Sequence, residues 1–528
     1  MTETYEIVAI GAGHNALTAA AYLAKAGKKV RVLEKNPWWG GGVVTREVTL
    51  PGFRHDTHAT GHSMILANPL IAQDELGLQA KYGLSYVNPD QPWSSVFEDG
   101  RVLCFFRDRH KNAEQIAKFS HRDAEAYLRF CELTRSFLPV FLASLYTPPP
   151  PNGAMLAMLD QSDAGRLIFR ALQMSAWDLL SEWFENDCVK LHFMKVISEN
   201  FAGPEEKGTA LGLFVFVGFM EEYGIATPRG GSGKLSDALV ACIEANGGTI
   251  ETNQEVTRVL VSGGRAVGVR LHDGREIRAT DAVIGSIHPH LLRRYIESVD
   301  PQVARDAENT QVAMFSILSI HAALNAPLEY RAGPEVANGY IIELLHTDML
   351  KTRRSFDALR YGEIPEQLLL AIVSPSVFDP TRAPPGKALM WGGSFLPFHL
   401  AAGGSRRWEE IGEQVADRII EAMREYVINL DAGNILARTV DTPLDMVRDS
   451  DSFQQGDVHG LAPYFHQFGS HRPTPALGQY TVPGLAGFYL VGPAQHPGGG
   501  VFGAGRGTAM KMFDDLKMDF DKVAGGKG

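Results

Sequence analysis

The hydrophobic pattern of the first 34 residues predicts a strand, a helix and a second strand. Tyr5–Ile10 is a short apolar run rich in β-branched residues, which is typical of a strand buried in a parallel sheet. The alanine-rich stretch that follows is expected to be a helix, and Gly27 is placed to end it. Lys29–Leu33 has the pattern of the next strand, and Glu34 follows it directly. This order predicts a βαβ unit of an α/β fold.

The rest of the chain repeats short strands and helices in a different order. Residues 71–225 are expected to be mostly helical, and residues 300–450 to mix strands with helices. The expected strands lie at 256–261, 266–271, 276–279, 282–285, 313–322, 368–373, 389–396 and 487–491, with a helix at 409–425. Glycine turns separate the first three of these strands, which predicts a β-meander.

The turn after the first strand has the glycine spacing of a dinucleotide site. Gly11, Gly13 and Ala16 fill the positions of G-x-G-x-x-G/A. The first permits a tight turn, the second lets a pyrophosphate approach the backbone, and the third lets the helix pack close to the sheet. A pyrophosphate would lie at the helix N-terminus, where free N–H groups attract an anion. Glu34 is suited to bind the adenosine ribose.

Two further glycine segments change the choice of cofactor. Gly40–Gly42 follows the ribose acid and offers a second close approach to the backbone, which NAD does not need. Near the carboxyl end, Gly492–Gly505 links the strand at 487–491 to a helix, which makes a second helix N-terminus for an electron-rich group. Together these segments favour the longer dinucleotide, FAD.

Composition and charge exclude several classes of function. The 528 residues favour two domains, and 45% hydrophobic with 21% charged residues is typical of a globular protein. The net charge of −11 argues against nucleic acid as a partner. The strand at Tyr5 leaves no room for a targeting signal, and the apolar run Ala210–Met220 is too short to span a membrane. We therefore expect a cytoplasmic protein; peripheral membrane contact and homo-oligomerisation stay open.

Three further segments resemble functional motifs, but their spacing does not match those motifs. The four cysteines form no C-x-x-C pair, which disfavours a redox disulfide, NADPH-linked disulfide reduction and a zinc site. His55, His58 and His62 lack the H-E-x-x-H spacing and an acidic cluster, so we expect no metal site. The glycine-rich segment 228–235 lacks the first glycine of a phosphate loop and has Leu235 after its Gly-Lys pair.

Both ends of the chain resemble one group of FAD-dependent oxidoreductases. The segments that carry the resemblance are GAGHN at 11–15, VLEKN at 32–36, the glycines at 40–42, TREVTLPGFRHD at 45–56 and DPTRAPPGK at 379–387. They are similar to phytoene desaturases, carotenoid isomerases and retinol saturase-like proteins, including those described as pyridine nucleotide-disulfide oxidoreductase domain-containing protein 2. That family more often has glycine where this chain has Ala16.

The resemblance implies a fold and its division into domains. The fold is an FAD-binding Rossmann-type α/β domain of three layers, with a parallel sheet and a β-meander, into which an α+β substrate domain is inserted. The expected FAD-binding domain comprises residues 1–70, 225–300 and 455–528. The expected substrate domain comprises residues 71–224 and 301–454.

The resemblance also assigns the contacts to the cofactor. The implied FAD-binding residues are Gly11, Gly13, His14, Asn15, Ala16, Glu34, Lys35, Gly41, Gly42, Thr45, Arg46, Val256, Gly492 and Gly503. Val256 is expected to bind the adenine through its backbone. The carboxyl-terminal helix end is expected to face the pyrimidine side of the flavin, where N–H groups stabilise the negative charge of the reduced ring.

Three residues are candidates for catalysis. His496 lies in the carboxyl-terminal glycine loop and is suited to proton transfer, because histidine titrates near neutrality, although a structural role before Pro497 is equally compatible. Arg506 is a candidate partner for the flavin edge or an acidic substrate. His58 lies on the histidine-rich segment that the resemblance places near the flavin.

The implied reaction is the dehydrogenation of a C–C bond in a hydrophobic small molecule. A hydride would go to flavin N5 and a proton would leave the neighbouring carbon, with oxygen or a quinone as the final acceptor. The methionine- and phenylalanine-rich residues 150–220 are compatible with an apolar substrate. Two alternatives stay open: double-bond isomerisation without net oxidation, and amine oxidation, which needs an aromatic cage that the sequence does not locate.

Overall fold

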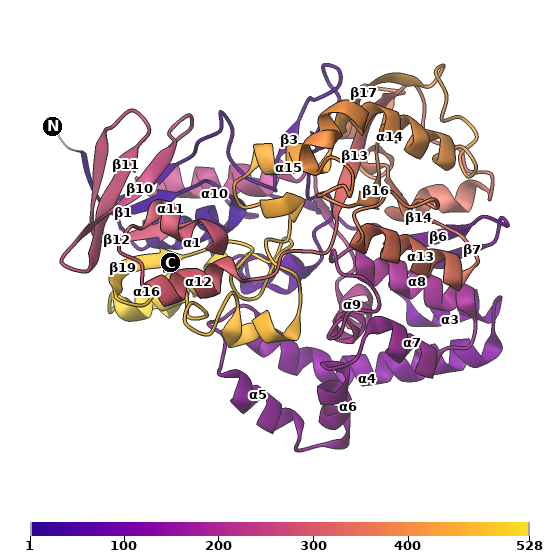
Figure 1. Cartoon of the computed structure of the whole chain (residues 1–528), viewed down its shortest axis with the longest axis horizontal. Coiled ribbons are helices and arrows are strands. Elements are labelled where there is room, and N and C mark those ends of the chain that lie inside the picture. Colours follow the sequence, from indigo (N-terminus) through magenta and orange to yellow (C-terminus); the bar gives the residue numbers. More distant parts are fainter. Residues whose placement is uncertain (1–2, 526–528) are drawn as a thin grey trace.

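The computed structural model describes residues 3–525, which form two large sheets in the two lobes of an elongated molecule (Figure 1). The first sheet has the order β10-β11-β19-β12-β1-β2-β9, and β18 pairs with β19. Its strands are β1 (Glu3–Ile10), β2 (Val30–Leu33), β9 (Thr249–Glu251), β10 (Val256–Ser262), β11 (Arg265–Leu271), β12 (Glu276–Gly285), β18 (Thr481–Val482) and β19 (Leu485–Leu490). The strands β9, β2, β1, β12 and β19 run parallel, whereas β10, β11 and β12 form an antiparallel meander.

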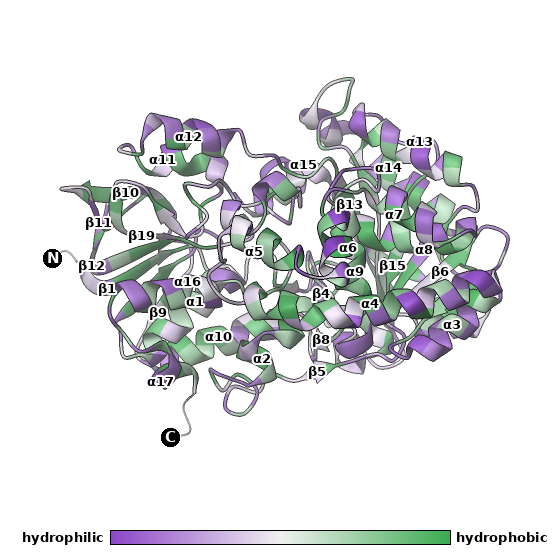
Figure 2. Ribbon diagram, turned by 90° about the horizontal axis from the view of Figure 1, so that it is seen from below, coloured by the Kyte–Doolittle hydropathy of each residue, from purple (hydrophilic) through white to green (hydrophobic). Residues whose placement is uncertain are grey.

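Alternate residues of β1 pack on opposite faces of this sheet. Ile7 and Ala9 join a core with helices α1 (His14–Lys25), α10 (Gly233–Ala245) and α16 (Gly505–Asp515). Val8 and Ile10 join a core with the meander and with helices α11 (Leu292–Tyr295) and α12 (Pro301–Glu308). The period of two residues in a strand sends neighbouring side chains to opposite sides. The structure thus confirms the expected three-layer α/β architecture. Figure 2 shows hydrophobic residues along β12 and β19 and hydrophilic residues on the outer helix α12.

The second sheet has the order β17-β13-β16-β15-β14-β6-β7. Its strands are β6 (Trp93–Phe97), β7 (Val102–Phe105), β13 (Ser316–Leu324), β14 (Ile341–Leu345), β15 (Leu370–Val373), β16 (Ala388–Leu396) and β17 (Ile435–Asp441). The short pairs are β3 (Thr45–Arg46) with β4 (His55–Asp56), and β5 (Tyr86–Val87) with β8 (Thr227–Pro228). The expected helical character of residues 71–225 is therefore wrong for 86–105, because β6 pairs with β14, a strand far along the chain.

Helices cover both sheets. They are α1 (His14–Lys25), α2 (Pro69–Ala72), α3 (Arg109–Ala117), α4 (His121–Leu145), α5 (Asn152–Leu159), α6 (Asp163–Ala171), α7 (Ala176–Trp183), α8 (Asp187–Ser198), α9 (Ala210–Glu222), α10 (Gly233–Ala245), α11 (Leu292–Tyr295), α12 (Pro301–Glu308), α13 (Met349–Arg360), α14 (Trp408–Met423), α15 (Pro443–Asp449), α16 (Gly505–Asp515) and α17 (Phe520–Ala524). Among residues 3–525, no helix has both the length and the apolar character needed to cross a bilayer.

Candidate functional site

A large cavity extends from the carboxyl ends of β1 and β2 to one face of the second sheet. Its volume is about 1830 Å³ when the space open to solvent is included. Gly11, Gly13 and Glu34 line one end, and Ile317 and Ala371 of the second sheet line the other. The ends of parallel strands are where open α/β sheets bind their ligands. The cavity therefore connects the predicted dinucleotide site with the second lobe.

Two glycine segments touch at the nucleotide end of this cavity. Gly11 has a positive φ of 85° and turns the chain from β1 toward α1. Gly40 N donates a hydrogen bond to Ala12 O at 2.8 Å, and a Cβ on Gly41 would lie 3.1 Å from Gly13 Cα. A side chain here would separate the two segments, so glycine is required for their approach. The result is a cradle of backbone at the N-terminus of α1.

Glu34 is buried beside this cradle. Its Oε2 accepts a hydrogen bond from Ala12 N at 2.7 Å and its Oε1 accepts one from Asn36 N at 2.9 Å. Burial raises the pKa of the Glu34 carboxyl, and these N–H donors offset part of that rise. The carboxylate is held rigidly at the cavity wall, as binding of ribose hydroxyls requires.

Several buried polar atoms on the cavity wall have no hydrogen-bond partner among residues 3–525. They are His14 Nε2, Asn15 Oδ1, Thr57 Oγ1 and His58 Nδ1. An unsatisfied buried polar atom costs about 1–3 kcal/mol, so this wall suits a polar ligand. Burial lowers the pKa of His14 to about 4, which keeps its ring neutral. Together with the glycine cradle and Glu34, these atoms fit the phosphates, ribityl chain and ring of FAD.

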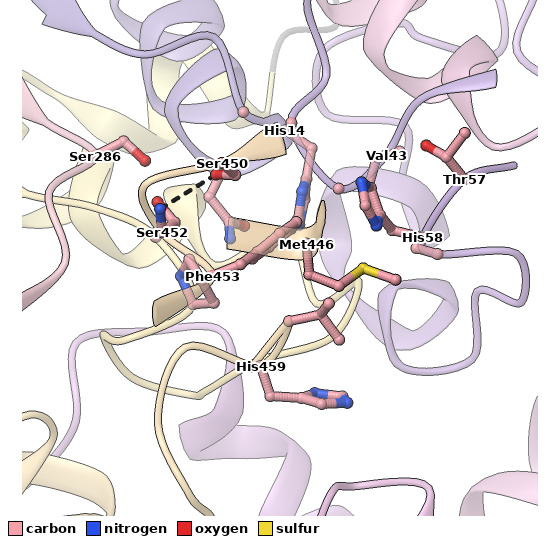
Figure 3. A pocket seen from close by; sticks show the side chains of 18 of the residues that line it. His14, Val43, Thr57, His58, Ser286, Met446, Ser450, Ser452, Phe453 and His459 are labelled. Carbon is pink, nitrogen blue, oxygen red and sulfur yellow. Dashed lines mark hydrogen bonds between the residues drawn. The ribbon is translucent and has the colours of Figure 1, made fainter. Parts of the chain in front are cut away.

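The cavity collects most of the residues predicted to bind the cofactor. Those on its wall are Gly11, Gly13, His14, Asn15, Glu34, Lys35, Gly41, Gly42, Val256 and Gly492, together with the catalytic candidate His58. Figure 3 shows His14 and His58 above His459, with Met446 and Phe453 of the 446–459 segment between them in this view. Ala16 lies in the core with no exposed surface, in agreement with its expected packing role.

Thr45 and Arg46 lie behind the cavity wall rather than on it. Thr45 Oγ1 donates to Asp56 Oδ1 at 2.6 Å and accepts from Gly233 N at 2.9 Å. The Arg46 guanidinium pairs with Asp449 at 3.1 Å. These contacts support neighbouring loops, and the geometry gives neither side chain a direct contact with a ligand in the cavity.

Asp449, which pairs with Arg46, also contacts the His58 ring. The ring's Nε2 lies 3.3 Å from Asp449 Oδ2, and its buried Nδ1 has no hydrogen-bond partner among residues 3–525. Burial acts to raise the pKa of Asp449, but the hydrogen bond from His58 and the charge of Arg46 outweigh it and hold that pKa below its ordinary value. Asp449 therefore fixes the orientation of the His58 ring.

His496 and Arg506 face other parts of the protein. His496 Nε2 donates to Ser144 O of α4 at 3.0 Å, and burial lowers the pKa of its ring to about 4. Arg506 forms two hydrogen bonds with Glu75, at 2.7 and 2.8 Å. Neither residue is on the cavity wall, so the geometry does not support their expected catalytic roles. The sequence placed both in the correct loop and helix, but it did not reveal their partners.

The carboxyl-terminal glycine loop reaches the cavity through its middle. Gly492, Pro493, Gly500 and Val501 line the wall, whereas Gly503 lies outside it and accepts a hydrogen bond from Asn68 at 3.3 Å. Helix α16 then starts against α1: a Cβ on Gly505 would lie 1.9 Å from Asn15 O. The two helix N-termini therefore meet beside the cavity, which concentrates N–H groups there.

The wall at the other end of the cavity was not predicted from the sequence. Its members are Glu199, Phe201, Ile317, Ser319, Ile341, Ala371, Val373, Trp391, Met446 and Val458. Most lie at alternate positions of strands β13–β16, so the period-two pattern identifies a face, but only the assembled sheet shows that it faces a cavity. For Glu199 there was a signal: it stands four residues after Lys195, at the carboxyl end of a helix, where an acid and a base can pair.

The other histidines of the 55–62 segment are bonded within the protein. His55 Nε2 lies 2.8 Å from Thr49 Oγ1, and His62 Nε2 lies 2.6 Å from Ser232 Oγ. In the part of the chain that the structure describes, His, Cys, Asp and Glu side chains form no group of three able to hold a metal ion. All four cysteines are free and buried.

Curated relatives match this chain along almost its whole length. A Rattus norvegicus protein described as pyridine nucleotide-disulfide oxidoreductase domain-containing protein 2 is 29% identical, over 97% of this chain and 94% of its own. One of the limonene dehydrogenase subunits of Castellaniella defragrans is 27% identical, over 97% and 95%. A lycopene-forming phytoene desaturase of Pseudescherichia vulneris is 26% identical, over 97% and 99%. The resemblance to the phytoene desaturase group is thus confirmed.

A solved structure and a family model agree with this assignment. Cyclohexylamine oxidase from Brevibacterium oxydans has the same fold, with a TM-score of 0.58 and 17% identity over 97% of this chain and 99% of its own. The family model described as flavin containing amine oxidoreductase matches residues 17–510. This chain therefore belongs to the flavin-containing amine oxidoreductase family, and its cofactor is FAD.

Proposed function

We propose that this oxidoreductase dehydrogenates a C–C bond of a hydrophobic small molecule. The observation that carries the proposal is the continuous cavity, which joins the glycine cradle to an apolar wall of sheet residues. Bound there, FAD supplies an acceptor for a hydride. The apolar wall would exclude water and orient a substrate with few polar groups. The names of two relatives, a limonene dehydrogenase and a phytoene desaturase, support a hydrocarbon substrate.

The cofactor-binding roles follow from the cavity wall. We propose that Glu34 binds the adenosine ribose, that Gly11, Gly13 and Gly41 admit the pyrophosphate to the backbone, and that Val256 contacts the adenine. His58 is the polar side chain that we propose for the flavin end, because Nδ1 is free and Asp449 holds the ring. Thr45, Arg46, Gly503, His496 and Arg506 would act indirectly, by holding these elements in place.

The proposed division into domains agrees with the strand pairing. Every strand of the first sheet falls within residues 1–70, 225–300 and 455–528, and every strand of the second falls within 71–224 and 301–454. We propose that the first set binds FAD and the second binds substrate.

We also propose a cytoplasmic location and a peripheral contact with a membrane. Met158 on α5 and Leu167 on α6 are both exposed and are suited to touch a lipid surface.

Two ring compounds test this function against its alternatives. FAD-loaded protein is mixed without oxygen with neutral limonene or with cationic cyclohexylamine, and the visible absorbance of oxidised flavin is followed. We expect limonene to bleach the flavin and to yield a product lacking two hydrogens. A product of unchanged mass indicates isomerisation, and bleaching by cyclohexylamine alone contradicts C–C dehydrogenation. Reoxidation by oxygen or by a quinone then identifies the acceptor.

A further inference from the structure

A carboxylate stands at the apolar end of the cavity. Glu199 caps the carboxyl end of α8 and lines the cavity wall together with Phe201 and Trp391. Its side chain is 24% exposed, so part of it faces the cavity. An ionised group in such surroundings is costly unless it is paired and used. Hydrophobic packing alone does not account for a glutamate at this position.

Two buried charged residues lie behind Glu199. The Lys195 ammonium pairs with Glu199 and also lies 2.8 Å from Glu343 Oε2. The exposed fractions of the Lys195 and Glu343 side chains are 2% and 0%. Trp93 Nε1 donates to Glu343 Oε1 at 3.2 Å. Burial raises the pKa of the Glu343 carboxyl, against the opposing effect of Lys195. The Lys195 ammonium therefore bridges the fully buried Glu343 and the part-exposed Glu199.

The position of Glu343 in the second sheet relates Lys195 and Glu199 to the apolar wall of the cavity. Glu343 lies opposite Ala371 in the register of β14 and β15, and it is two residues from Ile341 on the same strand. Ala371 and Ile341 both line the cavity. Glu199 therefore belongs to the end formed by the second sheet, opposite the glycine cradle. Lys195 holds the Glu199 carboxylate at this end, and a carboxylate that reaches the cavity is a group able to accept a proton there.

We propose that Glu199 is the proton acceptor of the dehydrogenation, with Lys195 and Glu343 as its positioning residues. The proposal rests on the proposed function and adds the group that this reaction needs. One substrate C–H bond breaks and its electron pair leaves as hydride to oxidised flavin. The neighbouring C–H bond breaks, its electron pair forms the C=C bond, and its proton goes to the Glu199 carboxylate. Loss of hydride leaves positive charge on carbon, which acidifies the neighbouring C–H bond and which a nearby carboxylate stabilises.

The rate of flavin reduction by limonene tests whether Glu199 accepts the proton. FAD-loaded wild type and Glu199→Gln are mixed with limonene in a stopped-flow instrument without oxygen. We expect the limiting rate of flavin reduction to fall about 100-fold or more in the variant, while the dissociation constant for this neutral probe stays the same. Glu205→Gln is the matched control, since Glu205 pairs with Arg353 and does not line the cavity. Its rate should equal that of the wild type.

Infrared difference spectra test the charge of Glu199 without turnover. The spectrum of the wild type minus that of Glu199→Gln should contain a carboxylate band at neutral pH. In a Lys195→Met background the same subtraction should give a protonated acid band instead. If Glu199 is protonated in the wild type, or if Glu199→Gln reduces flavin as fast as the wild type, the proposal is overturned.

Two further outcomes distinguish a failure of the proposed dehydrogenation from a failure of the proposed role of Glu199. If limonene does not reduce the wild-type flavin, the proposed function fails for this probe, and the infrared spectra still decide whether Glu199 is an ionised base. If Glu199→Gln weakens the binding of cyclohexylamine without slowing the limiting rate, Glu199 binds a cationic substrate and does not accept a proton.

Discussion

Glu34 combines deep burial with a set of donors that all come from the backbone. Its exposed fraction is 7%, and its two carboxylate oxygens accept hydrogen bonds from Ala12 N and Asn36 N. Each oxygen has a second lone pair for a ribose hydroxyl. The charge is therefore held in place before the ligand arrives, which reduces the entropy lost on binding.

Replacing this carboxylate by an amide should weaken FAD binding. In Glu34→Gln one acceptor oxygen becomes an NH₂ donor that faces a ribose hydroxyl or a backbone N–H group, so we expect the dissociation constant for FAD to rise about tenfold or more, or about 1.4 kcal/mol. Titration of apoprotein with FAD, followed by calorimetry, measures it. The part-exposed Glu276, which pairs with Arg270 at 2.8 Å, provides the control Glu276→Gln. Equal affinity in both variants would contradict the assignment of Glu34.

At the scale of elements, Arg506 joins three segments of the nucleotide-binding lobe. It lies in the first turn of α16, and its guanidinium group forms a bidentate pair with Glu75, which follows α2. Tyr22 of α1 donates a hydrogen bond to the same carboxylate. Burial raises the pKa of the Tyr22 hydroxyl well above its ordinary value. Arg506 Nη1 also donates to Tyr146 O at 2.9 Å. The pair therefore sets the position of α16, and through it that of the glycine loop.

Breaking the Arg506–Glu75 pair should lower the free energy of unfolding, without a direct effect on the reaction. We expect Arg506→Met to lower the free energy of unfolding by about 3–5 kcal/mol, because it leaves the buried charge of Glu75 without its cationic partner. Adding Glu75→Gln should restore part of the loss. Lys511→Met, on the same helix but in a part-exposed pair with Asp515, should change stability by about 0–1 kcal/mol. Denaturant unfolding measures all three, and an unchanged stability in Arg506→Met would return Arg506 to the catalytic candidates.

The whole molecule buries an unusual set of neutral histidines. Burial is the main cause that lowers the pKa of six of them to about 3 or 4; they are His14, His55, His62, His192, His288 and His496. In the unfolded chain a histidine titrates near 6.5. Between these values the unfolded state binds more protons than the folded state, so stability must fall as the pH falls.

Acid should therefore destabilise the folded protein well above the pH at which carboxylates titrate. We expect each of these histidines to lower the free energy of unfolding by about 1.4 kcal/mol per pH unit below about 6.5, until the pH reaches its folded pKa. Four carboxyls whose pKa is raised by burial act in the opposite direction with one proton each; they are Glu34, Glu221, Glu343 and Asp457. Unfolding of FAD-saturated protein from pH 7.5 to 4.5 measures the slope. His272→Gln, at an exposed histidine, should leave it unchanged, and a flat profile would contradict the burial.

Much of the first lobe could be predicted because its signals are local. The glycines at 11 and 13, the apolar strands around them and Glu34 lie within 34 residues, and each requirement acts on its near neighbours. The same holds for the carboxyl-terminal loop, whose strand and helix were predicted to within a few residues. No local pattern indicates the hydrogen-bond partners of Arg506 and His496, because Glu75 and Ser144 lie hundreds of residues away. The catalytic roles of these two residues stay predictions.

Local patterns in the chain are therefore sufficient to predict the βαβ unit, the meander, the dinucleotide and the family, since backbone turns and strand periods follow from adjacent residues. Which side chains face the cavity depends instead on how distant segments pack. Strand β6 pairs with β14, and Lys195 pairs with Glu343, through contacts between distant segments that no local pattern encodes. Burial and charge pairing depend on the packing of distant segments, and at this site they decide which polar groups are free to act.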